Sequence, residues 1–240
     1  MKIELCIDSV EAALTAQEYG ANRVELCANL LEGGTTPSIG TIALTRKAID
    51  IDLFVIVRPR GGDFLYSDKE FEVMQYNILE AKKLGVDGVV VGLLDRDGEI
   101  DIVRTQKLVE LARPMQVTFH RAFDRCLNPF DALEQLIELG VDRILTSGQE
   151  LTAWQGRELI KNLIKQADNR ICIMPGSGVN ADNIPDLAKY TQAQEFHFTA
   201  AQYREGDMLH QNPKFPREEY QKKVFDQEKL TQSIQALRTT

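Results

Sequence analysis

The hydrophobic positions of this 240-residue chain follow two periods that alternate along the sequence. Short runs carry apolar side chains continuously or at every second position, which is typical of strands with one or both faces buried. Longer stretches between them carry apolar residues three or four positions apart, as on the buried face of a helix. The strand-like runs lie near residues 2–8, 22–27, 53–58, 87–92, 116–120, 142–146, 170–174 and 194–198.

Helices are expected near residues 9–19, 38–49, 68–84, 101–112, 129–139, 152–167 and 180–189, with a last one near 216–237. Eight strand–helix units without a tight hairpin signal such as Asn-Gly indicate an α/β fold with parallel strands. We therefore predict a single (β/α)8 TIM barrel over about 2–198, closed by a C-terminal loop and helix over about 199–240, in one domain spanning 1–240. An open doubly wound sheet is the alternative, but no G-x-G-x-x-G motif follows the first strand.

One short sequence motif recurs in the connections from a predicted helix to the next strand. Gly20, Gly85 and Gly140 are each followed by a small apolar residue and then by Asn or Asp. Because Gly readily adopts the left-handed conformation that ends a helix, the motif predicts short connections at one end of the barrel. The strand-to-helix connections, notably 28–38 and 58–68, are longer and polar. Barrel enzymes carry their active sites at that second end.

Alternation along the strands places charged side chains inside the barrel or at its mouth. The residues so placed are Glu4, Cys6, Arg23, Glu25, Cys27, Arg58, His120, Glu195 and His197. Barrel interiors are mostly filled by branched aliphatic side chains, and a buried ionised group is costly unless it is paired. We therefore interpret Glu4, Glu25, Arg58 and His120 as functional residues.

The apolar run Val117–Phe119 ends abruptly in His120, Arg121 and Asp124. In an enzyme, His120 would act as a general acid/base with a glutamate as its counterpart, and Asp124 would belong to the same catalytic set. The structural alternative is that His120 satisfies a buried hydrogen bond while Arg121 and Asp124 form a local ion pair.

A small anionic, phosphorylated metabolite is the substrate expected for such an enzyme. Arginines suit an anion, and the small residues that end the sixth and seventh strands expose backbone N–H groups that can form an anion nest. The residues expected to bind the ligand are Arg60, Arg121, Ser147, Gly148, Gly176, Ser177, Gly178 and His197, with Arg58 beside them. The alternative is that these glycines only form tight turns.

Composition narrows the range of partners. A net charge of −8 and a pI near 5.1 argue against nucleic acid, which is bound by clustered Lys and Arg. No apolar run approaches the roughly 18 residues that span a bilayer. At the N-terminus, Glu4 lies where a signal peptide would need an apolar segment. We therefore expect a cytoplasmic protein without a membrane partner. Four cysteines without a C-x-x-C pair indicate neither a zinc ribbon nor a disulfide framework.

Several motifs together resemble one known family, CutC. The motifs are Glu4-x-Cys6, Ala21-Asn22-Arg23-Val24-Glu25-Leu26-Cys27, Glu32 to Ser38, Arg58 to Phe64, Val117 to Asp124, Leu145 to Gly148 and Gly176 to Gly178. The resemblance runs from residue 2 to about 200. It implies a cytosolic (β/α)8 barrel, a homo-oligomer and a role in copper homeostasis, with Cys6 and Cys27 as Cu(I) ligands; it implies no established catalytic activity.

The residues themselves are compatible with copper. Cu(I) is soft and prefers thiolates, and Cys6 and Cys27 point inward from neighbouring strands about 4.8 Å apart. Barrel strands are staggered, however, and a free Cys is often buried simply as a small hydrophobe. Two functions therefore remain open, a Cu(I)-binding protein and an enzyme acting on a small anionic metabolite, with a ligand-binding barrel without turnover as a third.

Overall fold

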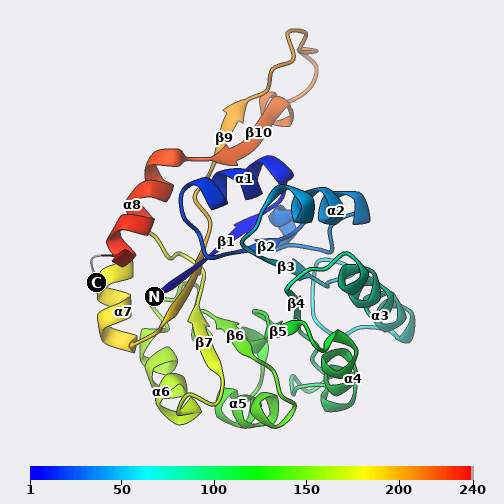
Figure 1. Ribbon diagram of the computed structural model, residues 1–240, viewed down its shortest axis with the longest axis vertical. Coiled ribbons are helices and arrows are strands. Elements are labelled where there is room, and N and C mark those ends of the chain that lie inside the picture. The colour runs from blue at the N-terminus through cyan, green and yellow to red at the C-terminus, as the bar shows by residue number, and fades with distance from the viewer. Residues whose placement is uncertain (239–240) are drawn as a thin grey trace.

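The computed structural model describes residues 1–238 and has a barrel of parallel strands surrounded by helices (Figure 1). The barrel strands are β1 (Lys2–Ile7), β2 (Arg23–Leu26), β3 (Asp52–Ile56), β4 (Gly88–Val91), β5 (Gln116–Phe119), β6 (Arg143–Thr146), β7 (Cys172–Pro175) and β8 (Glu195–Phe198). Each strand pairs with its sequence neighbour from β1 to β7, and β8 pairs with β1. No ladder joins β7 to β8 within residues 1–238, so the barrel is nearly closed. The predicted (β/α)8 fold is confirmed.

Helices cover the outside of the barrel. They are α1 (Val10–Glu18), α2 (Ile39–Ala48), α3 (Asp68–Lys83), α4 (Ile102–Ala112), α5 (Pro129–Glu138), α6 (Arg157–Ala167), α7 (Ile184–Thr191) and α8 (Gln227–Arg238). Side-chain caps begin several of them: Ser9 caps α1, and Ser67 with Glu70 forms a capping box at α3. None of the described helices is both long and apolar enough to span a bilayer.

The glycine of the recurring motif ends a helix in each of its three occurrences. Gly20, Gly85 and Gly140 have φ of 89°, 72° and 74°, the left-handed region that side chains with a Cβ rarely adopt. Each therefore allows the chain to turn directly into the next strand. The longer connections gather at the opposite end of the barrel, as predicted.

Strand alternation separates two environments. Ile3, Leu5 and Ile7 pack outward in the large apolar core between strands and helices. A smaller apolar cluster of Cys27, Phe54, Ile56 and Val90 belongs to the opposite, inward faces of β2, β3 and β4. The remaining inward positions include charged residues, which form the site described below.

The predicted helix over 216–237 is wrong in its first half. Residues Gln221–Phe225 form β10, which pairs antiparallel with β9 (Ala201–Glu205). Within the predicted range, Arg217–Tyr220 forms a short 3-10 helix and the α-helix covers only Gln227–Arg238. Helical spacing holds for the buried Leu230, Ile234 and Leu237, whereas Val224 is only half-buried in the hairpin. Because the hairpin has a long connection instead of an Asn-Gly turn, no local signal marks it.

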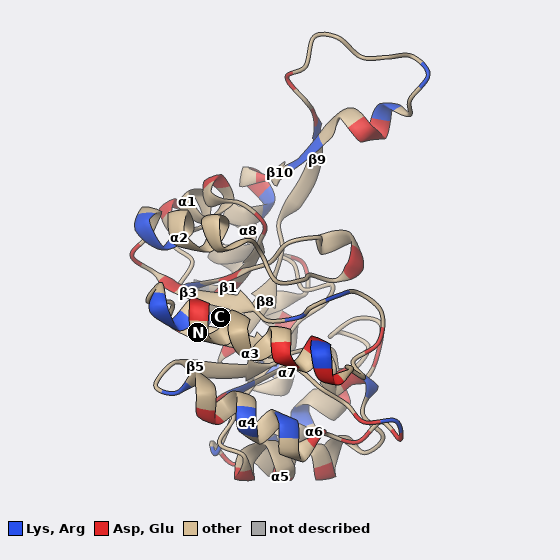
Figure 2. Cartoon of the chain, turned by 90° about the vertical axis from the view of Figure 1, so that its right-hand side faces the viewer, with Lys and Arg blue, Asp and Glu red and all other residues tan. Residues whose placement is uncertain are grey.

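The β9–β10 hairpin and its connecting loop project away from the barrel (Figures 1 and 2). From the sequence, the polar loop over 200–216 could either cover the mouth as a lid or join a subunit interface. No residue of this loop lines the central cavity, so it is not a lid in this structure. Residues 239–240, which end the predicted 1–240 domain, lie outside the described part.

Candidate active site and metal centre

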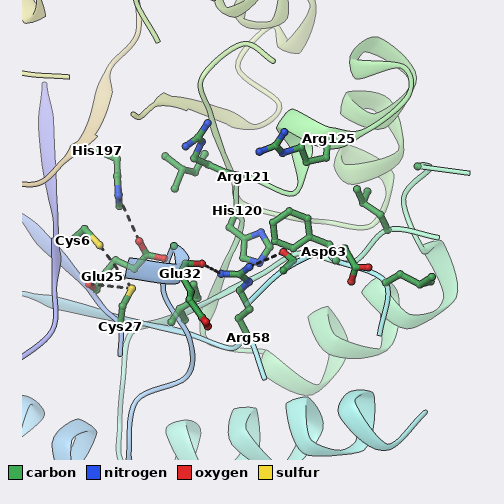
Figure 3. Close-up of a pocket in the computed structure, with 18 of the residues that line it drawn as sticks. Cys6, Glu25, Cys27, Glu32, Arg58, Asp63, His120, Arg121, Arg125 and His197 are labelled. Atoms are coloured by element: carbon green, nitrogen blue, oxygen red, sulfur yellow. Dashed lines mark hydrogen bonds and ion pairs between the residues drawn. The ribbon is translucent and has the colours of Figure 1, made fainter. Parts of the chain in front are cut away.

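A cavity of about 750 Å³ opens at the end of the barrel where the long connections gather. Figure 3 shows Cys6, Glu25, Cys27 and His197 together at the left of the cavity and Arg121 and Arg125 in its upper part, with His120 and Arg58 below these two arginines. The strands β1, β2 and β8 thus supply the thiols and carboxylates, and the segment after β5 supplies the histidine and arginines. A volume of this size is typical of small-molecule sites.

A buried ionic network lies beneath this cavity. Arg23, only 2% exposed, donates from Nε to Glu4 and from Nη2 to Glu195 Oε2 at 2.6 Å. Arg143 Nε donates to the same Glu195 oxygen at 2.6 Å. Both guanidinium groups also lie over the Phe54 ring, 4.8 and 5.4 Å from its centre. Paired charges therefore replace the usual aliphatic filling, which is how the inward carboxylates are tolerated.

Glu4 connects this network to the site above it. Burial by itself would raise the pKa of Glu4, but the charge of Arg23 and the hydrogen bond with His197 together outweigh burial and lower that pKa to about 2. The ionised Glu4 Oε1 lies 2.7 Å from His197 Nδ1. Glu4 is therefore a fixed anion that orients the His197 ring.

His197 is surrounded by groups that favour its charged form. Its Nε2 lies 3.6 Å from Glu25 Oε2. Burial would lower the pKa of His197, but the hydrogen bonds with Cys6 and Glu4 and the nearby Glu25 raise it well above its ordinary value. We infer that His197 is an imidazolium in the unliganded site.

Cys6 and Cys27 face each other with 3.8 Å between their sulfur atoms. The hydrogen bond with Cys27, followed by that with His197, overcomes burial and lowers the pKa of Cys6 to about 5. The same hydrogen bond, together with burial, raises the pKa of Cys27. Burial raises the pKa of Cys126 to about 12 and that of Cys172 to about 11. Cys6 is thus the one cysteine whose thiolate is stabilised, which is the form that binds soft metals.

Glu25 completes the group of possible metal ligands. It is 3% exposed, and burial outweighs the charge of His197 and raises the pKa of Glu25 to about 8, so this carboxyl group keeps its proton more readily than an exposed glutamate does. Ligand atoms of Cys6, Glu25 and Cys27 lie within 4.8 Å of one another, and those of Glu4, Glu25 and His197 form a second such group. The structure therefore brings together Cys6 and Cys27, the two predicted metal ligands, with three of the other predicted site residues.

His120 lies in the cavity wall as a neutral ring. Its Nδ1 accepts from the backbone N–H of Ala122 at 3.1 Å, so the proton is on Nε2, which is buried and has no partner among the described residues. Burial, aided by the charge of Arg58, lowers the pKa of His120 to about 3. Such a ring is a hydrogen-bond donor at neutral pH and a poor proton acceptor, which limits the general acid/base role expected from the sequence.

Acid is expected to weaken the fold through His120. The folded pKa of about 3 lies below the unfolded value of 6.5, so this stability is present above pH 6.5 and is lost as pH falls towards 3. Unfolding at pH about 5 should therefore be about 2 kcal/mol easier than at pH about 7.5 on this account alone. His120→Asn keeps an acceptor for the Ala122 N–H but has no imidazole to protonate. Between pH about 7.5 and pH about 5, its free energy of unfolding, measured by urea unfolding, should therefore fall by about 2 kcal/mol less than that of the wild type.

His210→Asn, on the exposed hairpin loop, is the matched control and should follow the wild-type pH dependence. A wild-type pH dependence in His120→Asn would show that the ring is protonated as easily in the folded chain as in the unfolded one.

The predicted anion-binding arginines have other partners. Arg58 reaches the cavity, but it donates to the carbonyls of Glu32 at 2.7 Å, Gly34 at 2.9 Å and Gly62 at 2.9 Å, and so ties two loops together. Arg60 pairs with Glu70 at 2.6 Å and does not line the cavity. Sequence periodicity reveals the direction of these side chains but not the loop carbonyls that they meet.

The predicted anion nest at Ser147 and Gly148 is already filled by a carboxylate of the chain itself. Asp124 accepts from the backbone N–H of Ser147 at 2.9 Å, from that of Gln149 at 3.3 Å and from the Thr146 hydroxyl at 2.5 Å. Asp124 also pairs with Arg121 at 2.7 Å, which agrees with the local ion pair named as the alternative. In this structure the Ser147 N–H binds Asp124 and the Gly148 N–H donates to the Thr146 hydroxyl at 2.9 Å, so both N–H groups already have a partner within the chain.

The second glycine turn also serves the fold. The Gly176 N–H donates to the Thr146 carbonyl at 2.9 Å, and the Ser177 hydroxyl donates to the Leu151 carbonyl at 2.9 Å. Neither these residues nor Gly178 line the cavity. The loops after β6 and β7 therefore fasten to each other, which accounts for their small residues without a phosphate.

Three residues of the site were not singled out by sequence reasoning. Arg143 neutralises Glu195 in the buried network, and Arg96 and Arg125 line the outer cavity. A signal for Arg143 was present, because it follows Gly140-Val141-Asp142 just as Arg23 follows Gly20-Ala21-Asn22. No comparable signal marks Arg96 and Arg125, since both lie in segments between the regular helices and strands.

Comparisons with known proteins agree on one family. A sequence profile described as the CutC family matches residues 1–202. The chain is 47% identical over 234 residues to the copper homeostasis protein cutC homolog of Mus musculus, covering 95% of this chain and 86% of that one. It is 47% identical over 245 residues to the family protein CutC of Bacteroides thetaiotaomicron, covering 99% and 98%. A crystal structure of the putative copper homeostasis protein CutC from Streptococcus agalactiae has a TM-score of 0.79 and 34% identity, covering 82% of this chain and 98% of that one.

Proposed function

This chain belongs to the CutC family, and from that premise we propose that it acts in copper homeostasis by binding one Cu(I) ion between Cys6 and Cys27. The relative from Mus musculus carries copper homeostasis in its name, which supports the general role. In this proposal copper is the cargo of the protein and not a resident cofactor.

The separation of the two sulfur atoms carries the proposal. Two thiolates bound at about 2.3 Å to one metal at a tetrahedral angle lie about 3.8 Å apart. Cys6 Sγ and Cys27 Sγ are 3.8 Å apart, so both can bind one ion without a change in the backbone. The register of β1 and β2 pairs Cys6 with Glu25, which leaves Cys27 two residues further along its strand and turned towards the same cavity.

The chemistry of the donors favours Cu(I) over harder cations. Thiolates select soft ions, whereas carboxylates and water suit Mg²⁺ and Ca²⁺. Glu25 lies beside the sulfur pair as a further donor, and His197 becomes one once its imidazolium loses a proton, so Zn²⁺ is the competitor that an experiment must include.

The test is an anaerobic titration with Cu(I) in the presence of a competing chelator. Wild type is expected to bind one ion per chain, and Cys6→Ser/Cys27→Ser should lose at least about 100-fold in affinity, or about 2.7 kcal/mol. Cys126→Ser/Cys172→Ser removes the same number of thiols away from the pair and should bind copper as wild type does. Parallel titration with Zn²⁺ should give weaker binding.

Equal copper affinity in Cys6→Ser/Cys27→Ser and wild type would refute the thiolate site. Tighter binding of Zn²⁺ than of Cu(I) would contradict the choice of cargo.

A second function, an enzyme acting on a small anionic metabolite, is favoured by one observation. His120 offers an unpartnered buried Nε2–H in a wall of the same cavity, where Glu25, with a raised pKa, lies ready to move a proton. Weak copper binding that does not depend on Cys6 and Cys27 would make this second function the better explanation.

A further inference from the structure

The cavity is far larger than the proposed copper site requires. A bare ion with two thiolates needs additional space on the order of one water molecule, about 30 Å³. The cavity measures about 750 Å³, within the range of pockets for small organic ligands. Most of its volume therefore lies beyond the sulfur pair.

The lining of this cavity includes guanidinium groups that have no salt-bridge partner within residues 1–238. Arg96 and Arg125 line it, are exposed, and form no ion pair within residues 1–238. Arg121 lines the same cavity and uses Nε for Asp124 and Nη2 for Ser147. Guanidinium groups placed in this way are suited to bind carboxylates.

The acidic residues of the same wall are already engaged. Asp63 pairs with Arg60 at 2.9 Å, and Glu32 accepts from the Asn29 amide at 2.8 Å. Asp95 accepts two backbone N–H groups of its own turn, each at 2.9 Å. These contacts leave Arg96 and Arg125 available for an external anion.

His120 provides an independent indication of a ligand. It is 5% exposed, and its Nε2 has no hydrogen-bond partner among the described residues, although its ring lines the cavity beside Arg58 (Figure 3). Because a buried donor without an acceptor is unfavourable, an oxygen atom of a ligand would stabilise this position.

We propose that the cavity binds Cu(I) together with a low-molecular-weight thiol that carries carboxylates. The sulfur of this thiol is a further ligand of the ion held by Cys6 and Cys27, its carboxylates pair with Arg96 and Arg125, and one of its oxygen atoms accepts from His120. This inference rests on the proposed copper site and names the form in which the cargo arrives. A soft-metal site and a free cationic surface within one cavity match a molecule that has a thiolate at one end and carboxylates at the other.

The transfer changes no oxidation state. Bonds form from Cu(I) to the sulfur atoms of Cys6 and Cys27, and any protons on them pass to the solvent. The bond from Cu(I) to the small thiol is kept in the complex and breaks when the thiol leaves.

Equilibrium dialysis with labelled reduced glutathione as the anionic thiol tests this inference. Wild type loaded with one Cu(I) is expected to retain one glutathione per chain, and removal of copper should weaken retention at least about tenfold. Arg96→Gln/Arg125→Gln should keep its copper and lose at least about tenfold in glutathione affinity. Arg157→Gln/Arg170→Gln, which removes two arginines outside the cavity, should retain glutathione as wild type does.

Two further ligands separate the thiol from the carboxylates. S-methylglutathione has no free thiol and should not be retained, and 2-mercaptoethanol has no carboxylate and should bind the wild type and both arginine variants equally. If Cys6→Ser/Cys27→Ser keeps its copper, the copper site itself is wrong, and this inference fails with it. Copper binding that depends on the two cysteines, together with wild-type glutathione retention in Arg96→Gln/Arg125→Gln, would refute the thiol complex and leave the copper site standing.

Discussion

Arg23→Met is expected to lower the free energy of unfolding by about 3–5 kcal/mol, a large share of the stability of a typical domain. Arg23 is the shared partner of Glu4 and Glu195 inside the barrel. Without its guanidinium, those two carboxylates stay buried with only His197 and Arg143 beside them. Met fills a similar volume, so the loss reports on charge compensation more than on packing.

Urea unfolding monitored by circular dichroism measures this effect. Arg23→Lys keeps the charge but loses the forked geometry, and it should fall between wild type and Arg23→Met. Arg170→Met is the control, because Arg170 forms a half-exposed pair with Glu134 and should cost about 0–1 kcal/mol. Equal losses in Arg23→Met and Arg170→Met would mean that the buried network contributes little to stability.

Asp124→Ala is expected to destabilise the fold by about 3 kcal/mol. The substitution leaves the buried Ser147 N–H and Thr146 hydroxyl and the part-buried Gln149 N–H without their acceptor, and each buried unsatisfied group costs about 1–3 kcal/mol. The loop after β6 should loosen first, because Asp124 is what fastens it to the segment after β5.

Hydrogen exchange distinguishes this local effect from general destabilisation. The Ser147 and Gln149 amides should exchange faster in Asp124→Ala relative to amides of β1. Asp97→Ala, an exposed carboxylate in the turn after β4, is the control and should change neither stability nor these rates appreciably. Unchanged protection of both amides in Asp124→Ala would exclude the fastening role of the carboxylate.

The stabilising network and the candidate copper site share residues. Arg23 holds Glu4, Glu4 holds the His197 ring, and that ring contacts Cys6. Substitutions in the network therefore affect the geometry of the thiol pair as well as stability. For this reason the copper titration compares cysteine variants with other cysteine variants and not with network variants.

Local sequence determined the barrel and the direction of its inward side chains. Strand alternation with a period of two assigned Glu4 and Cys6 to the inside and Leu5 to the outside, because successive side chains on a strand point to opposite faces. The glycine motifs marked the short connections, because glycine readily adopts the left-handed conformation that ends these helices and turns the chain into the next strand. Both signals act within a few residues, and a single sequence contains them in full.

Only the tertiary structure decided which partner each of these side chains meets. The parallel register aligns Glu4 with Arg23 and Cys6 with Glu25, and it is set by strand stagger rather than by any short motif. The filling of the Ser147 nest by Asp124, the use of Arg58 on loop carbonyls and the β9–β10 hairpin all depend on contacts between segments distant in sequence. Periodicity shows which way a side chain points, whereas its hydrogen-bond partner depends on where other parts of the chain come to lie.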